Sequence, residues 1–135
     1  YVVVHAWLVL ITYLHHTHPS CPHFDDKEWN WLKGALSTID RSFGFLNIIF
    51  HRITDTHVLH HLFSQVLHVL ALFGLMCFQI PHYHALEATE AIKPVIGEYY
   101  KSDDRNPLRA LWEDFRDTTY VAPDKAGDGV LWYRR

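Results

Sequence analysis

The stretch at residues 54–64 reads Thr-Asp-Thr-His-Val-Leu-His-His-Leu-Phe-Ser and contains three of the chain's twelve histidines. The threonine or the aspartate at its start can cap a helix that begins here. Positions i, i+3 and i+4 of a helix share one face, so His57, His60 and His61 point the same way. Three imidazoles on one face can converge on one or two metal ions. The stretch therefore predicts a helix that forms one wall of a metal site.

A second group of histidines follows an apolar run. Residues 1–14 are apolar apart from one histidine and one threonine, and residues 15–23 then read His-His-Thr-His-Pro-Ser-Cys-Pro-His. The two prolines end a helix and begin a polar loop. A membrane-spanning helix needs about 20 apolar residues, so we expect residues 1–14 to be the end of a transmembrane helix that starts before the chain. His16 and His18 would then lie at the membrane surface, where they can add metal ligands.

Composition excludes several other classes of protein. A net charge of −3 argues against nucleic-acid binding. The two cysteines form no CxxC pair, which argues against a thiolate zinc site or a disulfide framework. The chain has neither the Glu-x-x-His of carboxylate-rich di-iron bundles nor the HExxH of zinc peptidases. A histidine-rich, carboxylate-poor site beside a membrane indicates non-haem iron that acts on a lipid.

The rest of the chain is expected to be mainly α-helical. Apolar spacing and capping residues predict helices at about residues 27–39, 84–100 and 108–116. The end of the chain, residues 118–135, alternates short β-branched and aromatic pieces with Pro-Asp and Gly-Asp-Gly turns. The length suits one domain or a piece of one.

Several long motifs occur in an order that is typical of one family. They read His-Thr-His-Pro-x-x-Pro-His-x-Asp at residues 16–25, Glu-Trp-x-Trp-Leu-Lys-Gly-Ala-Leu at 28–36, the histidine box at 57–61, and Pro-His-Tyr-His-Ala-x-Glu-Ala-Thr-x-Ala-Ile-Lys-Pro-Val-x-Gly-Glu-Tyr-Tyr at 81–100. In these motifs the chain resembles the membrane-bound fatty acid desaturases, and above all the plant-type omega-6 (Δ12) oleate desaturases. The resemblance implies the C-terminal part of a multi-helix membrane protein of the endoplasmic reticulum, with residues 15–135 as a cytosolic helical cap.

The resemblance also implies a chemistry. Two histidine-ligated irons activate O₂ and remove hydrogen from adjacent methylenes of a lipid-linked acyl chain, converting oleate to linoleate. Electrons arrive from cytochrome b5 and its reductase. The box at 57–61 is similar to the family's third histidine box, and the first two boxes would lie upstream of this chain. The implied ligands are His57, His60 and His61, with His16 and His18 as additional candidates and Asp55 as a residue that orients a ligand ring.

Departures from the pattern leave alternatives open. Leu59 stands where oleate desaturases usually have alanine, and His15 where they usually have glutamine. A larger residue at position 59 is often found in omega-3 desaturases and in relatives that make acetylenic or conjugated bonds; a hydroxylase of the same family is a further alternative. A second alternative is that the chain is a non-catalytic fragment or pseudogene product that lacks the first two boxes. A soluble zinc-binding module is a third.

Residues 66–79 form an uncharged apolar insertion that the family pattern does not contain. Joining residue 65 to residue 80 restores His-Leu-Phe-Ser-Gln-Ile-Pro-His-Tyr-His without a gap. We therefore expect these residues to be a retained intron or miscalled coding sequence, with a lineage-specific loop as the rival interpretation.

Overall fold

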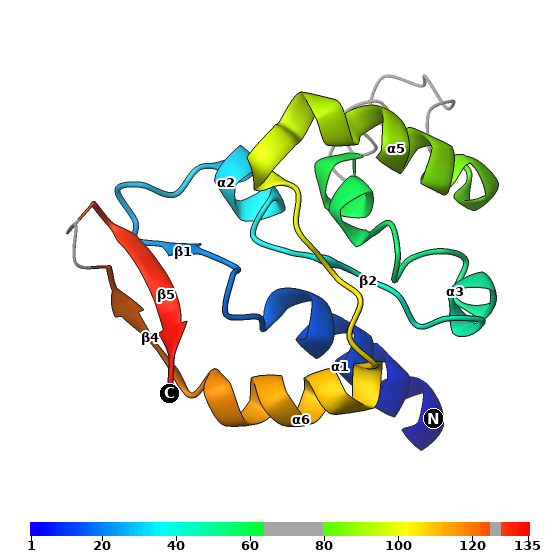
Figure 1. The fold of residues 1–135 in the computed structure, drawn as a ribbon, viewed down its shortest axis with the longest axis horizontal. Coiled ribbons are helices and arrows are strands. Elements are labelled where there is room, and N and C mark those ends of the chain that lie inside the picture. Colours follow the sequence, from blue (N-terminus) through cyan, green and yellow to red (C-terminus); the bar gives the residue numbers. More distant parts are fainter. Residues whose placement is uncertain (64–79, 125–127) are drawn as a thin grey trace.

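The structure, a computed structural model, describes residues 1–63, 80–124 and 128–135. The expected insertion at residues 66–79 lies outside these described residues. Helices and two small sheets alternate along the chain (Figure 1). The helices are α1 (Val2–His16), α2 (Trp31–Ala35), α3 (Leu46–Ile49), α5 (Ala85–Ile96) and α6 (Pro107–Asp117), with 3-10 turns η1 (His82–His84) and η2 (Gly97–Tyr99). Residues 57–63, which carry the histidine box, are also helical and are called the box helix below.

The apolar run at the start of the chain forms α1. The helix ends at His16, and the backbone N–H of Thr17 still bonds to the carbonyl of Tyr13 at 2.8 Å. Pro19 follows within one turn, as is common after a helix ends. Within the part of the chain that the structure describes, every helix falls short of the combined length and apolarity that crossing a membrane requires. The expectation that residues 1–14 continue an upstream spanning helix stays a prediction.

The helix expected at residues 27–39 is much shorter than predicted. Asp25 accepts bonds from the backbone N–H groups of Lys27 and Glu28, so the aspartate closes a turn and does not start a long helix. The helix α2 begins only after Asn30, whose extended backbone and side chain form the actual N-cap by accepting from the N–H of Lys33 at 2.9 Å. The prediction was wrong because the segment contains two capping residues. Asp25 closes a turn, and Asn30, directly before Trp31, caps the helix.

The two sheets are small and join distant parts of the chain. One sheet has the order β1-β5-β4, with β5 (Val130–Arg134) antiparallel to both β1 (His23–Phe24) and β4 (Tyr120–Pro123). The other pairs β2 (Asp40–Arg41) in parallel with β3 (Ser102–Asp103). Figure 1 shows β2 crossing the middle of the molecule between α1 and the box helix.

The apolar core lies where α1 meets α6 and the segment around α3. Leu14, Phe43 and Ala110 are its buried centre. Partly buried residues pack around them: Trp7, Leu10, Ile11, Tyr13, Leu46, Phe50 and Leu111. This core fixes the direction of α1 and therefore the position of the histidines at its C-terminal end.

Candidate metal centre

The box helix is capped from another part of the chain. Asp40 of β2 accepts a hydrogen bond from the backbone N–H of Val58 at 2.8 Å through one carboxylate oxygen. The expected local cap, Thr54, instead donates to the side-chain oxygen of Asn47 at 2.9 Å. A carboxylate at a helix N-terminus satisfies an orphan N–H and complements the helix dipole. The start of the histidine box is thus fixed by the central strand.

The end of α1 is tied to the same strand and to the segment before the box. His15 is fully buried, and its Nε2 lies 2.8 Å from the carbonyl oxygen of Thr54. Its own carbonyl accepts from the Thr38 hydroxyl at 2.8 Å and from the N–H of Ile39 at 3.1 Å. The two segments that carry histidines are therefore bound to each other through buried hydrogen bonds.

Three imidazoles meet at this junction. The Nε2 atom of His57 lies 3.3 Å from Nε2 of His16 and 3.2 Å from Nε2 of His61. One ligand atom from each of the three residues lies within 4.8 Å of the others. Metal–nitrogen bonds of about 2.0–2.1 Å place neighbouring nitrogen ligands roughly 3 Å apart. The spacing of the three rings fits a single metal ion.

The ring of His57 is oriented by the backbone. Its Nδ1 lies 3.1 Å from the carbonyl oxygen of Ile53, one turn earlier. A ring nitrogen that faces a carbonyl oxygen carries the proton, which leaves the lone pair on Nε2 directed at His16 and His61. The Ser37 backbone makes a comparable hydrogen bond to His16, which partly offsets the effect of burial on its pKa. The His57 ring thus presents its unprotonated nitrogen to the centre of the cluster.

Burial keeps these imidazoles in the neutral, metal-binding form. It lowers the pKa of His57 to about 2, with further lowering from neighbouring histidines. It also lowers the pKa of His61 to about 4, and it lowers the pKa of His16. A metal ligand has to be deprotonated at the coordinating nitrogen. The cluster is therefore ready to coordinate at neutral pH.

The structure places the other candidate residues around this centre but not in it. His60 is exposed and lies outside the converging group, although the centroid of its ring is 5.7 Å from those of His57 and His61. His18 has its Nδ1 2.6 Å from the Ser20 hydroxyl and its Nε2 3.6 Å from Asp103. Asp55 accepts from Arg52 at 2.7 Å and from Asn47 at 3.0 Å. Ligand roles for His60 and His18, and an orienting role for Asp55, stay predictions.

Two residues that position the site were not foreseen. His15 and Asp40 act through partners that lie 39 and 18 residues away, so no local spacing indicates them. The available signal was a charged pair, Asp40-Arg41, that directly follows an isoleucine. Burial of such a pair requires partners.

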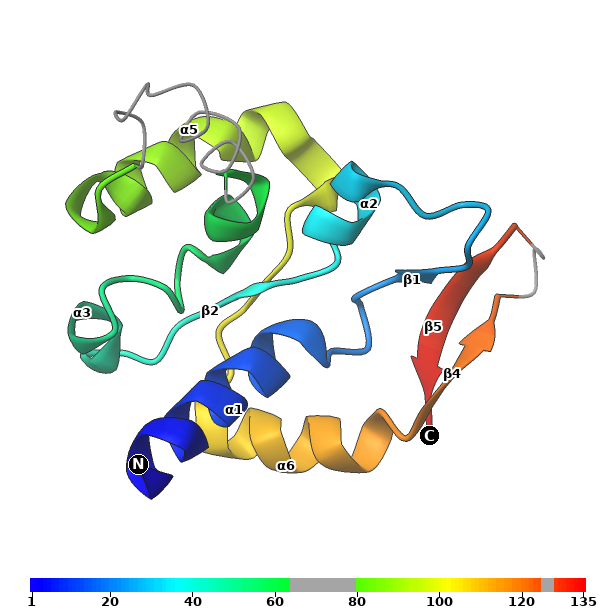
Figure 2. The ribbon, with the colours of Figure 1, turned by 180° about the vertical axis from the view of Figure 1, so that it is seen from behind.

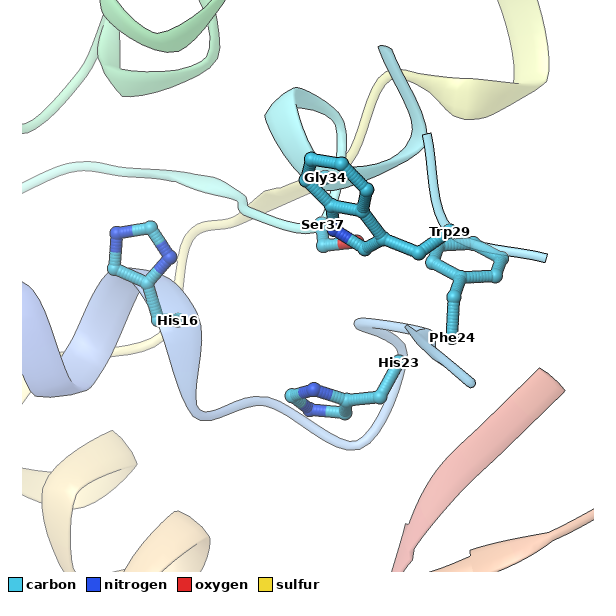
Figure 3. Close-up of a pocket in the computed structure, with 6 residues that line it drawn as sticks. All are labelled: His16, His23, Phe24, Trp29, Gly34 and Ser37. Carbon is cyan, nitrogen blue, oxygen red and sulfur yellow. The ribbon is translucent and has the colours of Figure 1, made fainter. Parts of the chain in front are cut away.

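A pocket of about 270 Å³ opens beside the cluster (Figure 3). Figure 3 shows His16 on one side of it and the rings of Phe24 and Trp29 on the other. His23, Gly34 and Ser37 complete the lining. An apolar, aromatic wall that faces a candidate metal ligand can hold a hydrocarbon group near the metal.

The cluster and the fold together define a class of protein. The donors are three imidazole nitrogens, with no thiolate or carboxylate in this group among the described residues. Imidazole suits iron, copper, zinc and nickel. The described part of the chain is thus about half helical with two small sheets, and it brings three histidines close enough together to hold one transition-metal ion.

Comparison with known proteins narrows this class. The chain is 53% identical over 99% of its length to the Δ(12)-oleate desaturase of Trichosanthes kirilowii. It is 52% identical over 98% of its length to the omega-6 fatty acid desaturase, endoplasmic reticulum, of Brassica juncea, and equally so to the Δ(12)-fatty-acid desaturase of Arabidopsis thaliana. The chain is a relative of the plant omega-6 fatty acid desaturases, and the resemblance inferred from its motifs is confirmed.

The similarity covers only part of those proteins. The chain spans about a third of the length of the curated relatives it matches, between 31% and 33% for these three. No family model matches the chain. No solved structure matches it either.

Proposed function

We propose that the complete protein is an O₂-dependent acyl desaturase of the endoplasmic reticulum membrane that converts lipid-linked oleate to linoleate. The convergence of His16, His57 and His61 on one point is the observation that supports it most directly. The sequence similarity to Δ(12) desaturases supplies the reaction. In this proposal residues 1–14 end a helix embedded in the bilayer, and the described residues from 15 onward form the cytosolic cap of a multi-helix membrane protein.

The metal of this proposal is a pair of non-haem irons, one of them held by His16, His57 and His61. Bound iron would supply the activation of O₂ that removal of hydrogen from unactivated methylenes requires. The remaining ligands include His60 and His18 and the histidine boxes expected upstream. The chain's own contribution is to hold neutral imidazoles at fixed spacing through the Ile53 carbonyl, the Asp40 cap and His15.

The pocket beside His16 would receive part of the acyl chain. Phe24 and Trp29 supply an apolar wall, which excludes water from a hydrocarbon segment. Cytochrome b5 and its reductase would deliver electrons from the cytosolic side. A glycosylation acceptor inserted beside the exposed Asp104 should accordingly remain unmodified in microsomes.

The deciding experiment expresses the complete coding sequence in a host that makes oleate but no linoleate. Gas chromatography of the fatty acids should show linoleate for the unchanged protein and none for His57→Ala. The iron content of the purified His57→Ala protein should fall as well. His84→Ala, which removes an exposed imidazole that is not part of the cluster, is the control and should retain both linoleate formation and iron. Linoleate from the His57→Ala protein at equal expression would end the proposal.

A further inference from the structure

One helix leaves an apolar stripe uncovered. Leu108, Trp112 and Phe115 of α6 are 73%, 68% and 71% exposed. They are spaced i, i+4 and i+7, so they share one face of the helix. The opposite face is the one that packs inward, through the buried Ala110 and Asp114. Three large apolar side chains on one face of an eleven-residue helix cost free energy in water and require a cover.

The neighbouring elements expose apolar side chains as well. The first turns of α1 expose Val2, Val3, Val4, Leu8 and Val9 to between 62% and 82%. The short helix α3 exposes Phe45, Ile48 and Ile49 to between 60% and 76%. The inward faces of all three helices share the core around Leu14, where the ring of Trp7 of α1 packs at a tilt against that of Phe50, with 5.1 Å between ring centroids. Figures 1 and 2 show α3 and α6 both beside α1, from opposite viewpoints.

Charge at the edge of the stripe favours lipid over protein as the cover. Arg109 and Arg116 lie next to the apolar face, about 100° from Leu108 around the helix. Arginines at such a boundary reach the phosphates of lipid headgroups while their stems cover apolar surface. Their partners Glu113 and Asp117 lie further round, toward the polar side. Tryptophan in the middle of the stripe is the residue preferred at a membrane–water interface.

We propose that α6 lies in the plane of a phospholipid membrane, with Leu108, Trp112 and Phe115 inserted at the boundary between headgroups and acyl chains. The inference rests on the proposed function, which places α1 in a bilayer. With α1 in lipid and α6 packed against it, the apolar stripe of α6 extends the same lipid-facing surface. The short apolar face of α3 extends it at the N-terminal end of α1.

The arrangement has a consequence for the metal cluster. From Val9, the last strongly exposed apolar residue of α1, to His16 the helix rises about 10 Å at 1.5 Å per residue. An in-plane α6 therefore holds the cluster at a fixed height above the lipid. An acyl chain would then have to leave the bilayer by up to that distance to reach the three histidines.

The test uses spin labels on the full-length protein reconstituted in phosphatidylcholine vesicles. A single cysteine replaces Trp112 in one variant and Val95 in the other. Val95 is the matched control, because it is an equally apolar and 82% exposed helix residue. It lies on α5, which both views place on the far side of the molecule from α6. Cys21 is fully buried, and burial raises the pKa of its thiol to about 12, so it will not take the label; other cysteines are changed to serine.

Power saturation compares collisions with oxygen, which concentrates in lipid, and with a water-soluble nickel chelate. The label at position 112 should collide more with oxygen and the label at position 95 more with the chelate. A label at 112 that behaves like the one at 95 would show a water-facing helix and overturn the proposal. A label at 112 shielded from both reagents would mean a protein cover and overturn it equally. Linoleate formation is measured on the same preparation, so a failure of the proposed function is recorded separately.

Discussion

The interior around the histidine cluster is rich in polar side chains, whereas the exterior of α1 and α6 is rich in apolar ones. This is the reverse of the usual distribution in a folded domain. Twelve polar or charged side chains are buried among the described residues, against nine apolar ones. Most soluble domains bury chiefly apolar residues. On the outside of α1, α3 and α6, by contrast, large apolar side chains stand exposed. The difference indicates that hydrogen bonds and ion pairs orient the site, whereas hydrophobic burial depends on a cover outside the described residues.

The buried polar region has two parts with different tasks. Asp40, His15 and Thr38 connect the two segments that carry the cluster. Arg41, which is fully buried, connects those segments to the rest of the fold. It donates to the carbonyl of Leu14 at 3.1 Å and to Asp114 at 2.9 Å, and it lies 2.8 Å from Asp103. The two parts can be broken separately.

Removing the buried cation should have the largest effect. Arg41→Met leaves Asp114 paired with the partly exposed Arg105, and Asp103 with Arg105 and with His18 at 3.6 Å, among the residues that the structure describes. Breaking a buried ion pair from one side costs about 3 kcal/mol of unfolding free energy. Thermal unfolding of the complete protein in detergent measures this loss of stability. The control is Arg116→Met, whose solvent-exposed pair with Asp117 should contribute little to the unfolding free energy. Equal midpoints for the two variants would contradict the assigned role of Arg41.

Removing the cap of the box helix should cost less stability but affect metal binding more directly. Asp40→Ala deletes the acceptor for the N–H of Val58 and for the Tyr100 hydroxyl, which lies 2.6 Å away. The loss is about 2 kcal/mol for a cap and a stranded hydroxyl. Metal content, measured by elemental analysis, should fall along with stability. Tyr100→Phe, which keeps the cap, should retain its metal, and a shared loss in both variants would place the effect in general stability.

Part of this arrangement could be predicted from sequence and part could not. The helical face of His57 and His61 follows from their spacing, and His16 follows from its place at the end of an apolar run. The cap by Asp40 and the bridge by His15 could not be predicted, because their partners meet only when β2 crosses between α1 and the box helix. The length of α2 was missed because Asp25 and Asn30 compete as caps.

Polar substitution on the exposed apolar side should barely affect folding. Phe115→Gln, in detergent, should change the unfolding free energy by less than about 0.5 kcal/mol, since the ring contacts little protein. Leu14→Gln is the buried counterpart on α1 and should destabilise by several times as much, because the amide would have no partner in the core. Thermal unfolding midpoints compare them. A large loss for Phe115→Gln would mean that protein, not lipid or detergent, covers α6.

The smallest expected effect is that of a substitution in the pocket, where the polar surface around His16 meets the apolar rings of Phe24 and Trp29. Gly34 lies in α2, and a methyl group added there would approach Nε1 of the Trp29 ring to 3.0 Å. Trp29 is largely exposed and can shift by a few tenths of an ångström, so the contact costs little. Alanine also favours the helix over glycine by about 0.5–1 kcal/mol. Gly34→Ala should therefore leave stability and metal content nearly unchanged.

Gly34→Ala should instead change the apparent affinity for the acyl substrate. Moving the Trp29 ring reshapes the apolar wall opposite His16, so the apparent KM for the acyl substrate should change while the iron content stays constant. Leu32→Ala is the control, since it alters a half-exposed residue of the same helix that does not line the pocket. Product formation in microsomes at several oleoyl-lipid concentrations separates the two. If Gly34→Ala and Leu32→Ala had the same apparent KM, the acyl chain would not pass through this pocket. The assignment of the histidine cluster would not be affected by that result. A KM effect confined to Gly34→Ala would instead place hydrocarbon against the aromatic wall, beside the imidazole of His16.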